Sequence, residues 1–220
     1  MLLRVQGGLS NFGRILHMSP NFLIEENLMN NGYPIIAGVD EVGRGPLAGP
    51  VTAAAVILDP LNIPDHLDDS KVLSFKKRLK LYEELKSSCT FAVAHVSSKE
   101  IDNLNILQAS LLAMVNAISE LDLTPSHILI DGNKVPERLV EKATAVVKGD
   151  SKVLSIAAAS IIAKVTRDKL MKDLDSEFPV YGWAKNAGYP TKCHMNAIVK
   201  YGVTPYHRRS FRPIHNILCG

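Results

Sequence analysis

The segment Val51–Leu58 constrains the fold more than any other part of the sequence. All of its residues are apolar except Thr52. A short, nearly continuous apolar run is typical of a β-strand that is buried on both faces, in the middle of a sheet covered by helices. The sequence therefore predicts an α/β domain built around this strand.

The hydrophobic periodicity predicts further elements around this strand. We expect additional strands at residues 35–39, 91–96, 127–130 and 144–147. We expect helices at residues 21–30, 75–87, 97–121, 155–169 and 191–201, the third of them introduced by a capping box at Ser97 and Glu100. The predicted fold is one α/β domain over residues 21–220, with a mixed central sheet of about five strands, flanking helices and a helical C-terminal segment.

Residues 1–20 are expected to lie outside this domain. They contain no Asp or Glu, and Gly7, Gly8 and Gly13 break any helix. The apolar core and the cleavage site of a secretory signal are missing. We expect a disordered or organelle-type leader, or an over-extended gene start, for which Met18 offers an alternative initiation site.

The net charge of +3 is distributed unevenly along the chain. Residues 178–220 contain six Lys or Arg and no acid, whereas residues 25–177 contain 17 basic and 22 acidic residues. The same C-terminal segment holds seven of the 13 aromatic residues. Basic residues interleaved with aromatics are typical of a nucleic-acid-binding surface, but a solvated helix with a few core aromatics would have the same composition.

Composition and cysteine usage exclude several other classes. With 46% hydrophobic and 21% charged residues, the chain has the composition of a globular protein, and no apolar run approaches the roughly 20 residues of a membrane helix. Cys89, Cys193 and Cys219 are too scattered for a disulfide framework or a zinc clip. We therefore expect no membrane association and a reducing, cytoplasmic location.

Four acidic residues lie where predicted strands end. Asp40 and Glu41 follow the strand at 35–39, and Asp131 and Asp150 follow the strands at 127–130 and 144–147. Carboxylates at strand ends can converge at one edge of a sheet, where their repulsion favours cations such as Mg²⁺ or Mn²⁺. For any single acid a role in a turn is the simpler explanation. The four together favour a metal site.

The turn Gly43–Arg44–Gly45 comes directly after the first acidic pair. Two glycines around one residue let backbone N–H and C=O groups approach a ligand closely. The turn matches neither a P-loop nor a dinucleotide-binding fingerprint. Beside two carboxylates, it could hold a sugar hydroxyl or a phosphate against bound metals.

Seven blocks of sequence, in order, resemble the ribonuclease HII family. The first block, at residues 38–51, reads GVDEVGRGPLAGPV. The others are Asp69-Ser70-Lys71 and residues 130–133, 147–151, 156–168, 188–192 and 207–211. The resemblance extends from about residue 22 to residue 212, which is nearly all of the chain outside the leader.

This resemblance implies a ribonuclease-H-like fold and a ribonuclease H activity. Such enzymes cleave the RNA strand of RNA–DNA hybrids and also cut ribonucleotide-containing duplex DNA on the 5′ side of single ribonucleotides. They leave 3′-hydroxyl and 5′-phosphate ends, use two Mn²⁺ or Mg²⁺ ions, and serve ribonucleotide excision and RNA primer removal.

The resemblance also implies roles for individual residues. Asp40, Glu41, Asp131 and Asp150 would be the catalytic metal ligands. Gly43, Arg44 and Gly45 would read the 2′-hydroxyl, and Tyr189 would stack on the sugar of the following deoxyribonucleotide. Lys71, Arg208 and Arg209 would lie near the phosphate backbone. The residues alone leave simpler alternatives open, namely a packed Tyr189 and a solvated Lys71, and for His194 and His207 we favour structural or phosphate-contact roles over general acid catalysis.

Comparison with related nucleases refines the prediction. The related ribonuclease HIII has an N-terminal substrate-binding domain, for which the 39 residues before Asp40 leave too little room, and it has Glu where this chain has Asp150. We expect a monomer, and we find no Gln-x-x-Leu-x-x-Phe-Phe motif for docking on a sliding clamp. The competing hypotheses are another two-metal nuclease of the same fold that cuts DNA, and a non-catalytic hybrid-binding protein.

Overall fold

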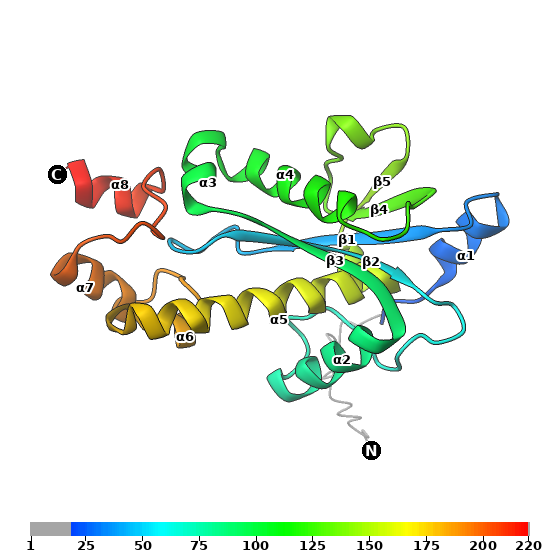
Figure 1. Cartoon of the computed structure of the whole chain (residues 1–220), viewed down its shortest axis with the longest axis horizontal. Helices are drawn as coiled ribbons and strands as arrows, with labels where there is room; N and C mark the ends of the chain where they lie inside the picture. The colour runs from blue at the N-terminus through cyan, green and yellow to red at the C-terminus, as the bar shows by residue number, and fades with distance from the viewer. Residues whose placement is uncertain (1–18, 220) are drawn as a thin grey trace, which may run out of the picture.

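A mixed five-stranded sheet forms the centre of the computed structural model, which describes residues 19–219 (Figure 1). The strands are β1 (Ile36–Val42), β2 (Val51–Leu58), β3 (Cys89–Val96), β4 (His127–Asp131) and β5 (Ala143–Val146). Their order is β3-β2-β1-β4-β5, with β1, β2 and β3 antiparallel and with β4 and β5 parallel to β1. The prediction of a mixed sheet of about five strands is confirmed.

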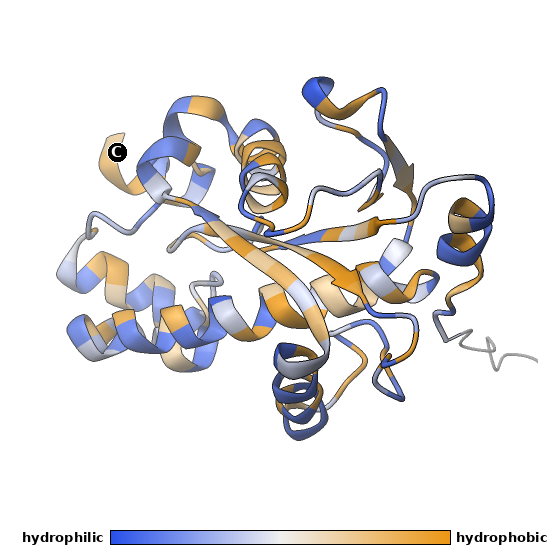
Figure 2. Cartoon of the chain, turned by 45° about the vertical axis from the view of Figure 1, so that its right-hand side comes forward, coloured by the Kyte–Doolittle hydropathy of each residue, from blue (hydrophilic) through white to orange (hydrophobic). Residues whose placement is uncertain are grey.

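The apolar strand β2 has the predicted bounds and is buried along its whole length. Its side chains alternate between two cores: Ala53 and Ala55 pack in the cluster that contains Met114, and Ala54 and Val56 pack in the cluster that contains Ile162. Both faces are therefore covered, which explains why the sequence of β2 shows no polar alternation. Figure 2 shows the central strands as predominantly hydrophobic.

Helices cover the two faces of the sheet. The helices of this part of the chain are α1 (Leu23–Asn30), α2 (Phe75–Ser88), α3 (Ser98–Leu104), α4 (Ile106–Ser119) and α5 (Leu154–Glu177). Helix α5 runs along one face with α2 beside it, while α3 and α4 lie over the other face (Figure 1). The short 3₁₀ turn η2 (Gly149–Ser151) leads into α5, and η1 (Glu137–Leu139) lies between β4 and β5.

The continuous helix predicted at residues 97–121 is wrong, because the chain breaks at Asn105. This residue adopts φ +71°, and its side chain accepts hydrogen bonds from the N–H groups of Leu107 (3.0 Å) and Gln108 (3.2 Å). Asn105 thus ends α3 and caps α4. The apolar stripe continues across the break, so periodicity alone did not reveal it. The capping box at Ser97 and Glu100 is confirmed.

Two other elements extend beyond their predicted C-terminal ends by three residues or more. Strand β1 continues to Val42, because Val42 still pairs with Thr52 of β2, so Asp40 and Glu41 lie within the strand rather than after it. Helix α5 continues to Glu177, and Met171 in this added part is completely buried.

Short helices form the C-terminal part around an aromatic core. They are η3 (Pro179–Tyr181), α6 (Trp183–Asn186), α7 (Lys192–Tyr201) and α8 (Arg212–Cys219). The rings of Tyr181 and Trp183 stack with centroids 5.1 Å apart, and both side chains are buried. Several aromatics of this basic segment therefore build a core, whereas Tyr189 and Tyr201 are exposed.

The predicted leader falls mainly on residues 1–18, which lie outside the described residues. The described chain begins at Ser19, and Pro20 is already buried. The N–H group of Asn21 donates to the carbonyl of Lys152 (3.2 Å). Within residues 19–219, no helix is long and apolar enough to cross a membrane.

Candidate active site

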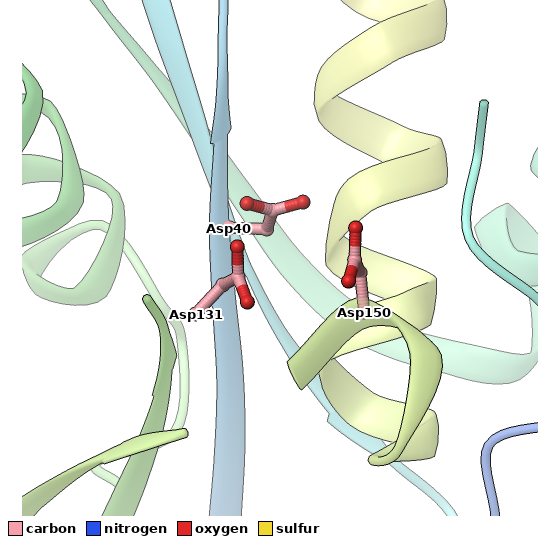
Figure 3. A group of neighbouring side chains, drawn as sticks. All are labelled: Asp40, Asp131 and Asp150. Carbon is pink, nitrogen blue, oxygen red and sulfur yellow. The ribbon is translucent and has the colours of Figure 1, made fainter. Parts of the chain in front are cut away.

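Three aspartates converge beside the N-terminal end of α5 (Figure 3). Asp40 lies on β1, Asp131 ends β4, and Asp150 lies in η2. Since β1 and β4 are parallel neighbours that pair Val39 with Ile130, the first two carboxylates lie at the same level of the sheet. One oxygen from each of the three side chains lies within 4.8 Å of the others. We call these three residues the acid centre.

Backbone groups orient two of the three carboxylates. The N–H group of Gly149 donates to Oδ1 of Asp131 (2.7 Å), and the N–H group of Glu41 donates to Oδ1 of Asp40 (2.7 Å). Asp131 is thereby tied to the loop that carries Asp150. The carboxylates of Asp40 and Asp131 are consequently oriented by backbone groups of β1 and η2.

The acid centre concentrates negative charge in a buried place. Burial raises the pKa of Asp40 well above its ordinary 3.8, and the neighbouring Glu41, Asp131 and Asp150 raise it further. Burial, Asp69 and Asp131 likewise raise the pKa of Asp150. Such a set is stabilised by cations, and three carboxylates suit hard divalent ions such as Mg²⁺ or Mn²⁺. The residues present therefore fit a divalent metal site.

The fourth predicted acid, Glu41, lies beside the acid centre but outside its three-oxygen group. Its Oε1 accepts a hydrogen bond from Nη1 of Arg44 at 3.1 Å. Burial raises the pKa of Glu41, and the guanidinium of Arg44 opposes this shift. Arg44 thus joins the glycine turn to the acidic pair.

Lys71 lies directly at the acid centre. Its Nζ is 3.3 Å from Oδ2 of Asp150 and 3.9 Å from Oδ1 of Asp69, and its side chain is 74% exposed. Burial alone would lower the pKa of Lys71, but Asp69, Asp150 and Asp40 raise it overall. The ammonium group therefore stays positive beside the aspartates.

The loop at residues 43–50, which we call the recognition loop, is held from behind by Arg208. This guanidinium donates from Nη2 to the carbonyl of Gly43 (2.6 Å), from Nη1 to that of Arg44 (3.0 Å) and from Nε to that of Gly49 (3.0 Å). Gly43 has φ +92°, in the region that favours glycine.

Arg208 was predicted to lie near the phosphate backbone, and the structure places it behind the recognition loop rather than at the surface. The side chain is completely buried, and backbone carbonyls of the recognition loop already accept its hydrogen bonds. Arg209 is exposed, and its backbone N–H group donates to Oδ2 of Asp102 (2.9 Å). Of the two arginines, Arg209 is the one with a side chain at the surface.

Tyr189 lies against the recognition loop with its side chain open to solvent. A Cβ atom on Gly45 would lie 3.4 Å from Cε1 of Tyr189, and the residue is 43% exposed. The glycine turn therefore has the acidic pair on one side, through the hydrogen bond of Arg44 to Glu41, and the ring of Tyr189 on the other. An exposed aromatic face beside a glycine turn is suited to stacking on a sugar or a base.

His194 and His207 form a buried hydrogen-bond network. Nδ1 of His207 accepts from the N–H group of Thr204 (2.9 Å), and Nε2 of His194 accepts from Nε1 of Trp183 (3.0 Å). The two Nε2 atoms are 3.2 Å apart, and Nδ1 of His194 donates to the carbonyl of Tyr189 (2.9 Å). All four ring nitrogens are thereby satisfied with both rings neutral.

Burial, followed by the nearby His194, lowers the pKa of His207 to about 4, which agrees with a neutral ring. Neither histidine is accessible, since both are buried. The structural role favoured for the two histidines fits this geometry, and general acid catalysis does not.

Sequence reasoning missed Arg167 and Asp69. Arg167 lies in the small-residue helix that was expected to pack on the sheet, and it is 1% exposed. Asp69 directly precedes Ser70 and Lys71 in one of the resembling blocks and shares Lys71 with Asp150. A charged residue at a buried position of a small-residue helix was the available signal for Arg167.

Comparison with known proteins agrees with this geometry. The family model described as Ribonuclease HII matches residues 37–214. The chain belongs to the ribonuclease HII family. A ribonuclease HII from Ruegeria sp. (strain TM1040) is 57% identical over 199 residues, covering 90% of this chain and 87% of that protein. One from Paracoccus denitrificans (strain Pd 1222) is 56% identical over 200 residues, covering 91% and 95%.

Solved structures with the same fold include the ribonuclease H2 from Pyrococcus horikoshii OT3. That chain is 30% identical, with a TM-score of 0.72, and the match covers 83% of this chain and 96% of that one. The predicted ribonuclease-H-like fold is thereby confirmed. Membership of this family gives the chain the activity of a ribonuclease H and a dependence on divalent metal ions.

Proposed function

We propose that this protein is an endoribonuclease that hydrolyses the RNA strand of RNA–DNA duplexes and cuts on the 5′ side of single ribonucleotides embedded in DNA. The products would carry a 3′-hydroxyl and a 5′-phosphate. Such an activity would serve ribonucleotide excision and RNA primer removal.

One observation carries this proposal: the acid centre, the glycine turn and Tyr189 are contiguous. Glu41 is bonded to Arg44 at 3.1 Å, and Gly45 lies against the ring of Tyr189. A hydrolytic centre therefore adjoins a rigid backbone turn and an aromatic platform. The 2′-hydroxyl is what distinguishes RNA from DNA at one nucleotide, and a backbone turn can read it at any base.

Asp40, Asp131 and Asp150 would hold the divalent ions, with Glu41 adjoining them. Their oxygens are those that Mg²⁺ and Mn²⁺ prefer. When bound, two such ions supply an activated water and stabilise the leaving oxygen of an in-line displacement. The chain's own contribution is to fix the three carboxylates on the sheet and on η2.

The cationic side chains would orient the substrate. Lys71 and Arg44 are exposed enough to meet phosphate oxygens while they stay beside the acids they neutralise, at 3.3 Å and 3.1 Å. Arg209 is a further surface cation for the duplex backbone. Such contacts supply affinity that is independent of sequence and sensitive to salt. Tyr189 would stack on the sugar of the deoxyribonucleotide that follows the ribonucleotide.

We further propose a monomer that acts in the cytoplasm. The three cysteines are free, which suits a reducing compartment. No sliding-clamp partner is proposed.

Cleavage assays on three duplexes of the same sequence test the proposed function. One duplex carries a single ribonucleotide, the second is an RNA–DNA hybrid, and the third is DNA only; each is incubated with Mg²⁺ or with Mn²⁺. We expect cleavage of the first two and none of the third. Cleavage of the DNA duplex would support a DNA nuclease instead, and cleavage of none would support a binding protein.

A matched pair of variants tests whether the acid centre is responsible for cleavage. Asp131→Asn removes one carboxylate of the centre, and Asp122→Asn makes the same change at an exposed position. The proposal expects loss of cleavage in the first variant and wild-type cleavage in the second. Equal activity of both variants would separate the observed nuclease activity from the acid centre.

A further inference from the structure

Two arginines are buried beneath the recognition loop without a carboxylate partner. Arg167 is 1% exposed and Arg208 is 0% exposed, and within residues 19–219 neither forms an ion pair. Burial lowers the pKa of Arg167 to about 10 and that of Arg208 to about 9. Burying an unpaired charge is costly, so these side chains have to be compensated by their hydrogen bonds.

The hydrogen bonds of Arg167 join two segments that are far apart in the sequence. Its Nη2 donates to the carbonyl of Ala48 (3.1 Å) and its Nε to that of Pro50 (2.9 Å), both in the recognition loop. Its Nη1 donates to the carbonyl of Ala187 (3.0 Å), two residues before Tyr189. One guanidinium therefore binds the glycine-turn loop and the tyrosine segment at the same time.

Further contacts hold the same two segments together. The N–H group of Leu47 donates to the carbonyl of Gly188 (2.8 Å). Gly188 has φ +84°, and a Cβ atom there would collide with the carbonyl oxygen of Ala48. The backbones thus meet at a distance that only glycine allows.

Arg167 also ties this assembly to the acid centre. It lies on α5, the helix that begins immediately after η2, which carries Asp150. A helix is a rigid spacer, so the position of Arg167 relative to Asp150 is fixed. The recognition loop, Tyr189 and the acid centre are therefore connected through one helix.

We propose that Arg167 is a positioning residue that sets the spacing between the Gly43–Gly45 turn and Tyr189, and thereby the recognition of an RNA-to-DNA junction. This inference rests on the proposed function, in which the turn meets the ribonucleotide and Tyr189 meets the next sugar. Contacts to two successive nucleotides require a fixed distance between the two contacting groups. A long hybrid, which offers a 2′-hydroxyl at every position of its RNA strand, depends less on that distance.

The chemistry of the side chain explains why this position is an arginine. A guanidinium presents five N–H donors in a planar fork and stays charged when buried. Lysine would keep the positive charge but has a single nitrogen, which cannot reach three carbonyls arranged around a plane. Arg167→Lys is therefore expected to loosen the spacing without removing the charge.

The test compares Arg167→Lys with Arg78→Lys under single-turnover conditions. Arg78 provides a control arginine, since it is also largely buried and donates to a backbone carbonyl, that of Leu73. Unlike Arg167, it pairs with a carboxylate, that of Asp168 (3.8 Å), and bonds Leu73 rather than the recognition loop. For Arg167→Lys we expect the rate on the single-ribonucleotide duplex to fall about tenfold more than the rate on the long hybrid, because misplacement by about 1 Å can cost on the order of 100-fold. For Arg78→Lys the ratio of the two rates should stay at the wild-type value.

A second variant tests the same spacing without touching a buried charge. Gly188→Ala adds one methyl group against Ala48 and should shift the ratio in the same direction; it decides the question if Arg167→Lys does not fold. If the two rates fall by the same factor, so that their ratio stays at the wild-type value, the inference is overturned. If the wild-type protein cleaves neither substrate, or cleaves the DNA duplex, the proposed function fails instead.

Discussion

The acid centre and the recognition loop are neighbours with opposite electrostatic designs. The acid centre gathers three carboxylates of like charge, and burial, together with the neighbouring acids, raises the pKa of Asp40 and Asp150. The recognition loop has its carbonyls bound by two buried guanidiniums. Within residues 19–219, the acid centre has only Lys71 beside its three carboxylates, at 3.3 Å from Asp150, and leaves most of their charge to be neutralised by bound cations. The carbonyls of the recognition loop are instead hydrogen-bonded by arginines of the chain itself.

This difference follows from what each region has to do. A centre that binds divalent ions has to keep charge that the protein does not neutralise, and it does so at a cost in stability. A surface that measures a sugar has to be rigid, so its polar groups are bonded before the substrate arrives. The comparison predicts that substitutions in the acid centre affect chemistry, and that substitutions behind the recognition loop affect stability and selectivity.

The largest effect is expected for Asp131→Asn. Turnover should fall by about 100-fold or more, since even residues that only support metal ligands contribute about 10–100-fold. Binding of the duplex, measured by fluorescence anisotropy, should change little because the cationic contacts are intact. Substantial remaining activity in this variant would remove Asp131 from the acid centre.

The recognition loop should respond to Arg208→Met by losing stability. Several buried carbonyls would lose their donor, which we expect to cost about 3 kcal/mol in the free energy of unfolding. Arg209→Met, at the neighbouring exposed position, should stay within about 0.5 kcal/mol of the wild type. Urea unfolding measures both, and equal values for the two variants would contradict the supporting role of Arg208.

A smaller, selective effect is expected for Tyr189→Ala. Loss of the stacking platform should reduce cleavage of the single-ribonucleotide duplex about tenfold, since stacking contributes about 1–3 kcal/mol per base. The long hybrid should be affected less. Tyr201, also exposed, provides the control. Equal losses on the two substrates would reject Tyr189 as the group that senses the junction.

The smallest effect concerns the pH dependence of stability in EDTA. The folded protein holds protons on Asp40 and Asp150 more tightly than the unfolded chain, because their pKa is raised above 3.8. The stabilisation present at low pH is therefore lost as the pH rises above 3.8 and through the raised pKa values of these two groups.

The Asp40→Asn variant should avoid part of this loss. Its free energy of unfolding at neutral pH should exceed that of the wild type by on the order of 1 kcal/mol. Urea unfolding of both proteins across this pH range measures the difference. A wild type that gains stability over the variant as the pH rises would contradict the raised pKa.

Much of the fold could be predicted from the sequence because periodicity reports burial. The bounds of β2 followed from its unbroken apolarity, and Ser97 and Glu100 marked the start of α3. The break at Asn105 was missed, since a single residue with φ +71° leaves the apolar pattern unchanged.

The candidate site, like the fold, could be predicted from the sequence only in part. Asp40 and Asp131 could be predicted to converge because they lie near the ends of β1 and β4, which are neighbours in the sheet, whereas Asp150 is brought to them by η2 after β5. The burial of Arg208 could not be predicted, because a basic residue in a basic segment is normally at the surface. Its role depends on carbonyls of residues 43–49, which are brought to it only by the folded chain.

The position of the cut is the most direct test of the account. A duplex with one ribonucleotide, labelled at either end of the ribonucleotide-containing strand, is cleaved with Mn²⁺, and the products are resolved to one nucleotide. We predict a single cut on the 5′ side of the ribonucleotide, with a 3′-hydroxyl and a 5′-phosphate, and no cut when the 2′-hydroxyl is replaced by hydrogen. A cut within the DNA, or one that persists without the 2′-hydroxyl, would contradict it.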